Sequence, residues 1–419
     1  MEIKILGGAR EVGRSAVLVK TAGGARLLLD YGVRIEDKVM FPSHVSPRDL
    51  DAVLITHAHL DHVGAAPLFF ASSAPKTYAT EATLNQAHIL LKDMLKLSGY
   101  YLPFGEAEIT NFIRKTERVK YGDIIRIKDA EIQFIDAGHI PGSAQIVVNA
   151  DKTLVYTGDF NPIRTRLLNS FKDPGTGFDV VITESTYALE AHEPRNLLED
   201  KIVGLARETI GQGGFMVVPA FAVSRSQEVA CILYAHGIKD NVWLDGMARE
   251  LLQLYLNDEE YVDGIDLLSK ASRKLRLVRG KKDRERVLEE PGIAITPAGM
   301  LKGGPAMYYA QNVASDPTSS ILLVSFQAPN TPGAKLLLDG KLPVNGDEVT
   351  VSSRVVQYKL SAHAGQKELR EYVSRRGDKG VVVAIHGDPE ATEAFARWIT
   401  ENTGYTGLNP SMGEWIKCY

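Results

Sequence analysis

A cluster of metal-binding side chains follows directly after a short apolar run, and this feature constrains the fold most. The run Ala52–Ile55 predicts a buried strand, and the chain from Val63 onward predicts a helix. The positions between them hold three histidines and one carboxylate, namely His57, His59, Asp61 and His62. The carboxyl end of a strand in an α/β sheet is a usual place for a ligand, and imidazole with carboxylate suits zinc and similar divalent ions.

The spacing within this cluster indicates two metal ions rather than one. His57 and His59 flank Ala58, so both side chains can point to one side of an extended turn. Asp61 and His62 follow where the chain bends, and can reach a second point nearby. The alternative is a polar loop whose histidines only cap a helix. Because the chain has only 10 histidines in 419 residues, so dense a cluster favours the metal site.

Composition bounds the class of protein. A chain of 419 residues is too long for one ordinary core and predicts two domains. It has 44% hydrophobic and 24% charged residues, no long apolar run and no signal-peptide pattern, so we expect a cytoplasmic protein outside the membrane. Cys231 and Cys418 provide neither a disulfide framework nor a thiolate zinc site. The net charge of −4 means that nucleic-acid binding would need a local basic patch.

Carboxylates and a histidine follow other predicted strands in the first 160 residues. Asp30 follows three leucines and is either a turn cap or a support for metal-bound histidines. His139 lies in a glycine-containing loop, where a lone histidine usually has no special role. Asp159 follows an apolar run and a glycine, and its two oxygens suit a bridge between two cations.

Three further residues have the same placement later in the chain. Glu184 ends a predicted buried strand. His363 follows the predicted strand Val355–Leu360, and His386 follows the predicted strand Val381–Ile385.

The stretch from about Arg195 to residue 350 has a different pattern, in which helices and strands alternate as in a parallel βαβ domain. Two of its turns have the small residues that a phosphate-approaching loop needs, with Ser224 and the cation Arg225 in one and Gly299 in the other. The alternative is that these are ordinary helix starts.

Nine basic residues lie between Ser269 and Arg286, against Asp283 and Glu285: Lys270, Arg273, Lys274, Arg276, Arg279, Lys281, Lys282, Arg284 and Arg286. Such a run is usually a solvated face. Beside a catalytic cleft it would instead neutralise phosphates, and the sequence leaves both alternatives open.

Taken in order, these residues resemble the motifs of the metallo-β-lactamase superfamily and of its β-CASP branch of nucleic-acid hydrolases. The first set of motifs is carried by Asp30, His57, His59, Asp61, His62, His139 and Asp159, and the β-CASP set by Glu184, His363 and His386. Pro219–Ala222, Asp245–Ala248 and Gly299–Gly304 are similar to the archaeal homologues of the cleavage and polyadenylation endonuclease subunit, of the type without an amino-terminal KH module.

The resemblance implies an α/β fold, in which a parallel α/β β-CASP domain is inserted into a metallo-β-lactamase αββα sandwich. We expect residues 1–194 and 353–419 to form the sandwich and residues 195–352 the inserted domain, with the substrate in the groove between them.

The resemblance also implies two zinc ions per chain. The first would be held by His57, His59, His139 and Asp159, and the second by Asp61, His62, Asp159 and His386. Asp30 would orient the ligands of the first ion.

The function that the resemblance implies is zinc-dependent hydrolysis of single-stranded RNA, in RNA processing, mRNA 3′-end maturation or decay. Asp159 and Asp61 would orient the nucleophile, and His363, held by Glu184, would act as the general acid. Ser224, Arg225 and Gly299 would bind phosphates. DNA-directed members carry an apolar residue at the position of His386, which favours RNA.

Alternatives are a 5′–3′ exoribonuclease of the same fold, a catalytically silent RNA-binding subunit of a processing complex, or a DNA or small-molecule hydrolase. Silent relatives lose metal ligands, whereas this chain keeps every one that the resemblance identifies. The segments Gly407–Pro410 and Met412–Glu414 are similar to the tail through which archaeal relatives dimerise. A homodimer and RNA-processing or transcription-termination partners are therefore expected.

Overall fold

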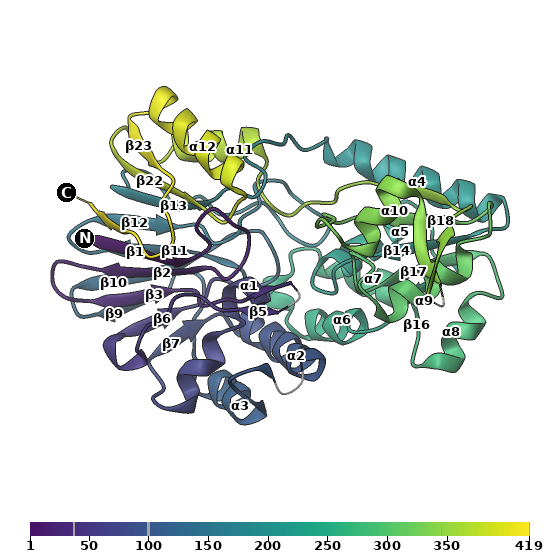
Figure 1. Cartoon of the computed structure of the whole chain (residues 1–419), viewed down its shortest axis with the longest axis horizontal. Coiled ribbons are helices and arrows are strands. Elements are labelled where there is room, and N and C mark those ends of the chain that lie inside the picture. Colours follow the sequence, from purple (N-terminus) through teal and green to yellow (C-terminus); the bar gives the residue numbers. More distant parts are fainter. Residues whose placement is uncertain (37, 99–100, 345, 419) are drawn as a thin grey trace. The chain divides into compact units, whose positions relative to one another are not determined.

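The computed structural model describes residues 1–36, 38–98, 101–344 and 346–418, which form two compact units. The first unit comprises residues 1–163, 170–192 and 362–419, and the second comprises residues 164–169 and 193–361. The chain leaves the first unit twice and returns to it twice, so the second unit is an insertion (Figure 1).

Two seven-stranded sheets form the centre of the first unit. The first sheet has the order β24 (Trp415–Lys417), β1 (Glu2–Gly7), β2 (Ala16–Lys20), β3 (Arg26–Leu29), β6 (Ala52–Leu54), β7 (Thr77–Ala79) and β8 (Glu117–Arg118). The second has the order β23 (Tyr405–Leu408), β22 (Gly380–Ile385), β13 (Val180–Glu184), β12 (Thr153–Tyr156), β11 (Ala144–Asn149), β10 (Ala130–Asp136) and β9 (Ile124–Ile127). Alternate side chains of both sheets, such as Leu27, Leu29, Ile146 and Val148, meet in one buried core.

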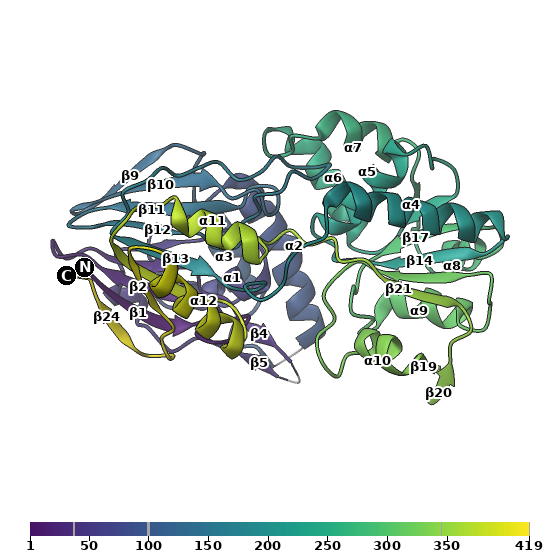
Figure 2. The same cartoon turned by 90° about the horizontal axis from the view of Figure 1, so that it is seen from above.

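Helices complete this unit on its outer sides. The helices α11 (Gln366–Ser374) and α12 (Pro389–Asn402) pack through Tyr372 and Phe395 against the second sheet (Figure 2). Beside the first sheet lie α1 (Leu60–Val63), α2 (Glu81–Ser98) and α3 (Glu106–Lys115) (Figure 1). The expected αββα sandwich is confirmed. None of the helices in the described ranges is both long and apolar enough to cross a membrane.

The second unit is built on a six-stranded parallel sheet, which confirms the expected inserted domain. Its order is β16 (Arg276–Leu277), β15 (Val242–Leu244), β17 (Gly292–Thr296), β14 (Phe215–Pro219), β18 (Ser320–Leu323) and β21 (Arg354–Gln357). Its helices are α4 (Arg195–Gly211), α5 (Arg225–Ala235), α6 (Ala248–Asn257), α7 (Ile265–Ser272), α8 (Lys281–Val287), α9 (Gly304–Val313) and α10 (Pro332–Asp339). A hairpin of β19 (Lys341–Val344) and β20 (Asp347–Thr350) follows α10.

The boundaries between the units differ from the expected ones. The second unit ends at Ser361 rather than at residue 352, because β21 pairs in parallel with β18 and so belongs to the inserted sheet. The segment 164–169 also belongs to the second unit, although it lies within the range expected for the first.

Parallel pairing brings the strand ends of the first unit to the same edges of its sheets. β3 runs parallel to β6, and β12, β13 and β22 run parallel to one another. The residues at their carboxyl ends are Asp30 after β3, His57 after β6, Asp159 after β12, Glu184 at the end of β13 and His386 after β22. This placement is where an α/β sheet usually binds its ligand.

Candidate metal centre

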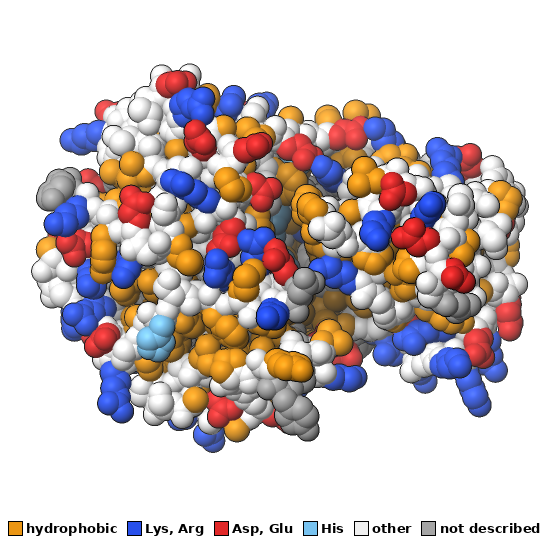
Figure 3. Space-filling view, in the orientation of Figure 1, with side chains coloured by type: hydrophobic (Ala, Val, Ile, Leu, Met, Phe, Trp, Pro, Cys, Tyr) orange, Lys and Arg blue, Asp and Glu red, His pale blue; other side chains and the backbone are white. Residues whose placement is uncertain are grey.

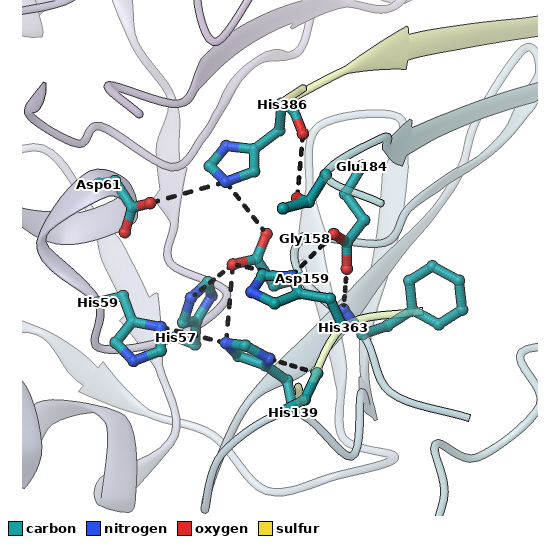
Figure 4. Close-up of polar contacts among 12 residues, drawn as sticks. His57, His59, Asp61, His139, Gly158, Asp159, Glu184, His363 and His386 are labelled. Carbon is teal, nitrogen blue, oxygen red and sulfur yellow. Dashed lines mark hydrogen bonds and ion pairs between the residues drawn. The ribbon is translucent and has the colours of Figure 1, made fainter. Parts of the chain in front are cut away.

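The first group of candidate ligands lies at these strand ends (Figure 4). Its members, which each offer one ligand atom within 4.8 Å of the others, are His57, His59, His139 and Asp159. His59 Nδ1 lies 3.1 Å from His139 Nε2, and His57 Nε2 lies 3.4 Å from Asp159 Oδ2. Four ligand atoms of these types around one point are a sufficient set for tetrahedral zinc.

A second group lies on the other side of the Asp159 carboxylate. Asp61, His62 and His386 also offer ligand atoms within 4.8 Å of one another. The second carboxylate oxygen of Asp159, Oδ1, lies 3.3 Å from His62 Nε2 and 3.7 Å from His386 Nε2. Asp61 Oδ2 lies 3.6 Å from His386 Nε2. Asp159 therefore presents one oxygen to each group, the arrangement of a bridging ligand.

Four of the imidazoles are held by their outer nitrogen. The contacts are His57 Nδ1 to Thr56 Oγ1 (3.0 Å), His62 Nδ1 to Asp30 Oδ2 (2.7 Å), His139 Nδ1 to the Ala362 carbonyl oxygen (2.7 Å) and His386 Nδ1 to Ser15 Oγ (2.8 Å). Such contacts select the tautomer and the orientation of a metal-binding ring. In each case they leave Nε2 directed toward the centre.

Asp30 has a different partner from the expected one. The resemblance implies that Asp30 orients ligands of the first group, but its carboxylate contacts His62, a member of the second group, and reaches His57 only through Thr56. Asp30 also accepts hydrogen bonds from the Thr56 N–H (2.7 Å) and the Tyr156 hydroxyl (2.8 Å). Its φ of 56° turns the chain at the end of β3 and brings the buried carboxylate to this position.

Buried polar atoms in the centre show that these residues suit a cation. Within the described part of the chain, His57 Nε2, His62 Nε2 and Asp159 Oδ1 are buried and accept or donate no hydrogen bond. A buried polar atom without a partner is costly, so such atoms usually have a ligand. Nitrogen and carboxylate oxygen without thiolate are ligands that fit zinc.

The ionisation states of His59, His139 and Asp159 also favour metal binding. For His62, burial alone would lower the pKa, but Asp159 and Asp30 raise it well above its ordinary value, so a metal ion would displace a proton there. Burial and the neighbouring His57 lower the pKa of His59 to about 3, and burial with the neighbouring His363 lowers the pKa of His139 well below its ordinary value. Burial alone would raise the pKa of Asp159, but the attraction of His62 and His386 holds it well below its ordinary value. Neutral imidazoles and an ionised carboxylate are the forms that bind metals.

His363 and Glu184 form a pair beside the first group. His363 Nδ1 lies 2.8 Å from Glu184 Oε2 and 3.9 Å from Asp159 Oδ2. Glu184 is buried and also accepts the Phe160 N–H at 2.9 Å, which fixes the carboxylate. Burial alone would lower the pKa of His363, but Glu184 and Asp159 together raise it to about 9. Asp159, Glu184 and His363 also meet the geometric criterion for metal ligands.

Several contributors were not predicted. Ser15, Tyr156 and the Ala362 carbonyl support the centre, and the His192 ring contacts the His363 carbonyl oxygen at 3.0 Å. Thr56 lies next to the histidine cluster, so its position in the sequence was a usable signal. The others lie far along the chain from the residues that they support, and no local pattern marks them.

The three candidates for phosphate binding lie in the second unit. Arg225 begins α5 and is only 6% exposed, and the Ser224 N–H donates to the Tyr255 hydroxyl at 3.2 Å. Gly299 lies in the loop after β17. All residues of the two ligand groups, in contrast, belong to the first unit.

Three family models match this chain. Residues 9–198 match the metallo-β-lactamase superfamily and residues 226–336 the β-CASP domain. Residues 348–410 match the Zn-dependent metallo-hydrolase RNA specificity domain.

Named proteins and a solved structure are similar over nearly the whole chain. RNase aCSPSF2 of Saccharolobus solfataricus is 37% identical over 99% of this chain and 85% of its own length. Probable RNase MJ4 of Methanocaldococcus jannaschii is 35% identical over 100% of both chains. The crystal structure of a protein of unknown function from Enterococcus faecalis matches with a TM-score of 0.65 and 16% identity over 99% of both chains, which concerns the fold alone.

Proposed function

The chain belongs to the β-CASP branch of the metallo-β-lactamase superfamily, and we propose that it is a zinc-dependent ribonuclease that hydrolyses phosphodiester bonds of single-stranded RNA. The observation that carries the proposal is the Asp159 carboxylate between two groups of candidate ligands. RNA as the substrate is supported by the names of the two ribonuclease relatives and by the match to the RNA specificity domain.

Two zinc ions per chain are proposed, one for each group. The ligands would be His57, His59, His139 and Asp159 for one ion, and Asp61, His62, Asp159 and His386 for the other. When bound, zinc supplies a water-derived nucleophile near neutral pH and stabilises negative charge on a phosphate. Asp159 and Asp61 orient the attacking water by accepting its hydrogen bonds.

His363 is the proposed general acid, because the Glu184 carboxylate at its Nδ1 stabilises the protonated ring. Glu184 accepts a hydrogen bond from His363 Nδ1, which leaves Nε2 to donate a proton to the leaving oxygen of the RNA.

Ser224, Arg225 and Gly299 are proposed to bind RNA phosphates, since their loops follow the carboxyl ends of β14 and β17. The resemblance implies an apolar residue at the position of His386 in DNA-directed members, so this histidine supports RNA over DNA as the substrate. RNA processing, 3′-end maturation or decay is the proposed process.

Cleavage of single-stranded RNA, labelled internally or at either end, tests this function. We expect cleavage that a chelator abolishes, with DNA of the same sequence and the double variant Asp61→Ala, His62→Ala as controls. Discrete internal fragments would identify an endonuclease, and mononucleotides released from one end an exonuclease of the same chemistry. RNA that stays intact in the presence of bound zinc would contradict the proposal.

A further inference from the structure

A hollow of about 530 Å³ lies at one edge of the parallel sheet in the second unit. Its walls are formed by Trp243, Leu275, Leu277, Arg279, Asp283 and Arg286. Trp243 comes from β15 and Leu277 from the adjacent edge strand β16, while Asp283 and Arg286 come from α8. Two cations of the basic run, Arg279 and Arg286, therefore lie in the wall of a hollow with both apolar and charged side chains.

Most cations of the run have no ionic partner within the described part of the chain. Among the residues that the structure describes, no carboxylate oxygen lies within 4.0 Å of the charged groups of Lys270, Arg273, Lys274, Arg279, Lys281, Lys282 and Arg286. Arg284 is paired with Asp245 at 2.6 Å and Arg276 with Glu290 at 3.8 Å. Lys and Arg side chains gather around α8 (Figure 3). In a chain of net charge −4, this is a local excess of positive charge.

The Asp283 carboxylate in the wall of the hollow has a structural task. Asp283 accepts the Arg279 N–H at 2.8 Å and so holds the loop that leads into α8. It does not pair with the side chain of Arg279 or Arg286. Both guanidinium groups therefore stay available to an anion.

Trp243 provides an aromatic surface between these cations. Its indole is half-buried and packs partly against the core of the unit, which holds the ring in place. The Arg276 guanidinium lies 5.0 Å from the ring centroid. An aromatic ring combined with free arginines is the combination with which proteins bind single-stranded nucleic acid, since bases stack on the ring and cations contact the backbone.

We propose that this hollow is an RNA-binding site built from residues other than those of the metal centre, with a base packed on the exposed part of the Trp243 indole beside Arg276 and flanking phosphates bound by Arg279 and Arg286. The choice of RNA as the ligand rests on the proposed function. The hollow would anchor the substrate without taking part in hydrolysis.

Binding of a fluorescent single-stranded oligoribonucleotide of about ten nucleotides tests the site. The protein carries Asp61→Ala and His62→Ala, so that the probe stays uncleaved. Adding Arg279→Ala and Arg286→Ala is expected to reduce the slope of log K against log salt by about 1.4, or about 0.7 for each phosphate that the protein no longer neutralises. Trp243→Leu is expected to weaken binding at least about fivefold, and Trp243→Phe to retain most of the affinity. With 5-iodouridine in the probe, photocrosslinking should label Trp243.

The matched control removes Arg207 and Lys341, two exposed cations of the same unit that do not line the hollow. An equal loss of affinity in this control, unchanged affinity in Trp243→Leu, or crosslinks only elsewhere would overturn the site. An RNA-cleavage assay of the wild-type protein distinguishes a failure of the proposed binding site from a failure of the proposed ribonuclease function. If RNA is cleaved but the hollow variants bind normally, only the binding site is wrong. If RNA is not cleaved but these variants lose binding, the site stands and the proposed function is wrong.

Discussion

At the residue scale, the candidate metal centre depends on histidines whose two nitrogens have different partners. His62 binds Asp30 through Nδ1, and His386 binds Ser15 through Nδ1, while Nε2 of each ring faces Asp159. Because the outer contacts fix the rings, an ion would find its ligands already oriented.

His363→Ala tests the division between ligands and general acid. We expect kcat to fall about 10²- to 10⁴-fold with unchanged zinc content, since the variant removes proton donation and no assigned ligand. Glu184→Gln, which keeps the size of the side chain, should reduce kcat less and lower the pH at which activity declines on the alkaline side. Zinc content and the pH profile of kcat are measured together. Loss of zinc from His363→Ala would instead make His363 a ligand.

Asp30→Asn tests the support of His62. Asparagine tolerates the positive φ of this position as aspartate does, so the variant changes mainly the charge on the oxygen that His62 contacts. We expect zinc affinity of the second group to fall about 10- to 100-fold, measured by competition with a chelator. Asp51→Asn, at a partly exposed carboxylate that salt-bridges Lys128, is the control. An equal loss of zinc affinity at both ligand groups would instead indicate a general disturbance of the fold.

At the scale of elements, buried charges hold the short segment 164–169 to the helices of the second unit. Glu228 of α5 is fully buried and accepts the N–H groups of Arg166 (2.7 Å) and Leu167 (3.0 Å). Glu199 of α4 accepts from the Arg166 side chain at 2.9 Å. These contacts explain why the segment belongs to the second unit although its neighbours in sequence belong to the first.

This network predicts a pH-dependent stability. Burial alone would raise the pKa of Glu199, but the hydrogen bonds and positive charges of Arg166, His236 and Arg195 together outweigh it and hold the pKa below the ordinary 4.5. A lowered pKa in the folded protein means that the ionised carboxylate stabilises above the pKa of the unfolded chain, and that this stability is lost as the pH falls through the folded value. We expect Glu199→Gln to cost about 2 kcal/mol at neutral pH, and less as the pH falls below about 4.

Urea unfolding across this pH range measures the difference. Glu250→Gln, at an exposed position in α6, is the control and should change stability little at any pH. A cost for Glu199→Gln that stays constant down to the lowest pH would contradict the ionic explanation.

At the scale of the whole molecule, metal removal should affect one unit only. All groups of candidate metal ligands found among the described residues belong to the first unit. A metal ion at a free concentration of about 100 times its Kd adds about 2.7 kcal/mol to the free energy of unfolding of the unit that binds it. A chelator is therefore expected to lower the unfolding temperature of the first unit and to leave that of the second nearly unchanged.

The two cysteines report on the units separately. Cys418 is buried in the first unit and Cys231 in the second, so each thiol becomes reactive when its own unit unfolds. Thiol labelling during heating, read by mass spectrometry, should show earlier labelling of Cys418 after chelation and unchanged labelling of Cys231. An equal shift of both thiols would mean that the units unfold together.

Much of the fold followed from local pattern. The alternation of strands and helices from Arg195 predicted the parallel sheet that the second unit has. The residue at which the chain passes back from the second unit to the first was harder to predict from the sequence. The apolar run after Arg354 is compatible with either unit, and only its pairing with β18 assigns it to the second.

Which side chains stand at the strand ends can be predicted from local sequence, because strand formation and the placement of His57, Asp159 and His386 after apolar runs are local properties. The tertiary structure decided which of them meet. Ser15 and His386 are 371 positions apart, and Asp30 contacts His62 rather than a member of the first group. Such contacts depend on parallel strands that bring their ends to one edge, and the pairing of distant strands is a property of the whole chain.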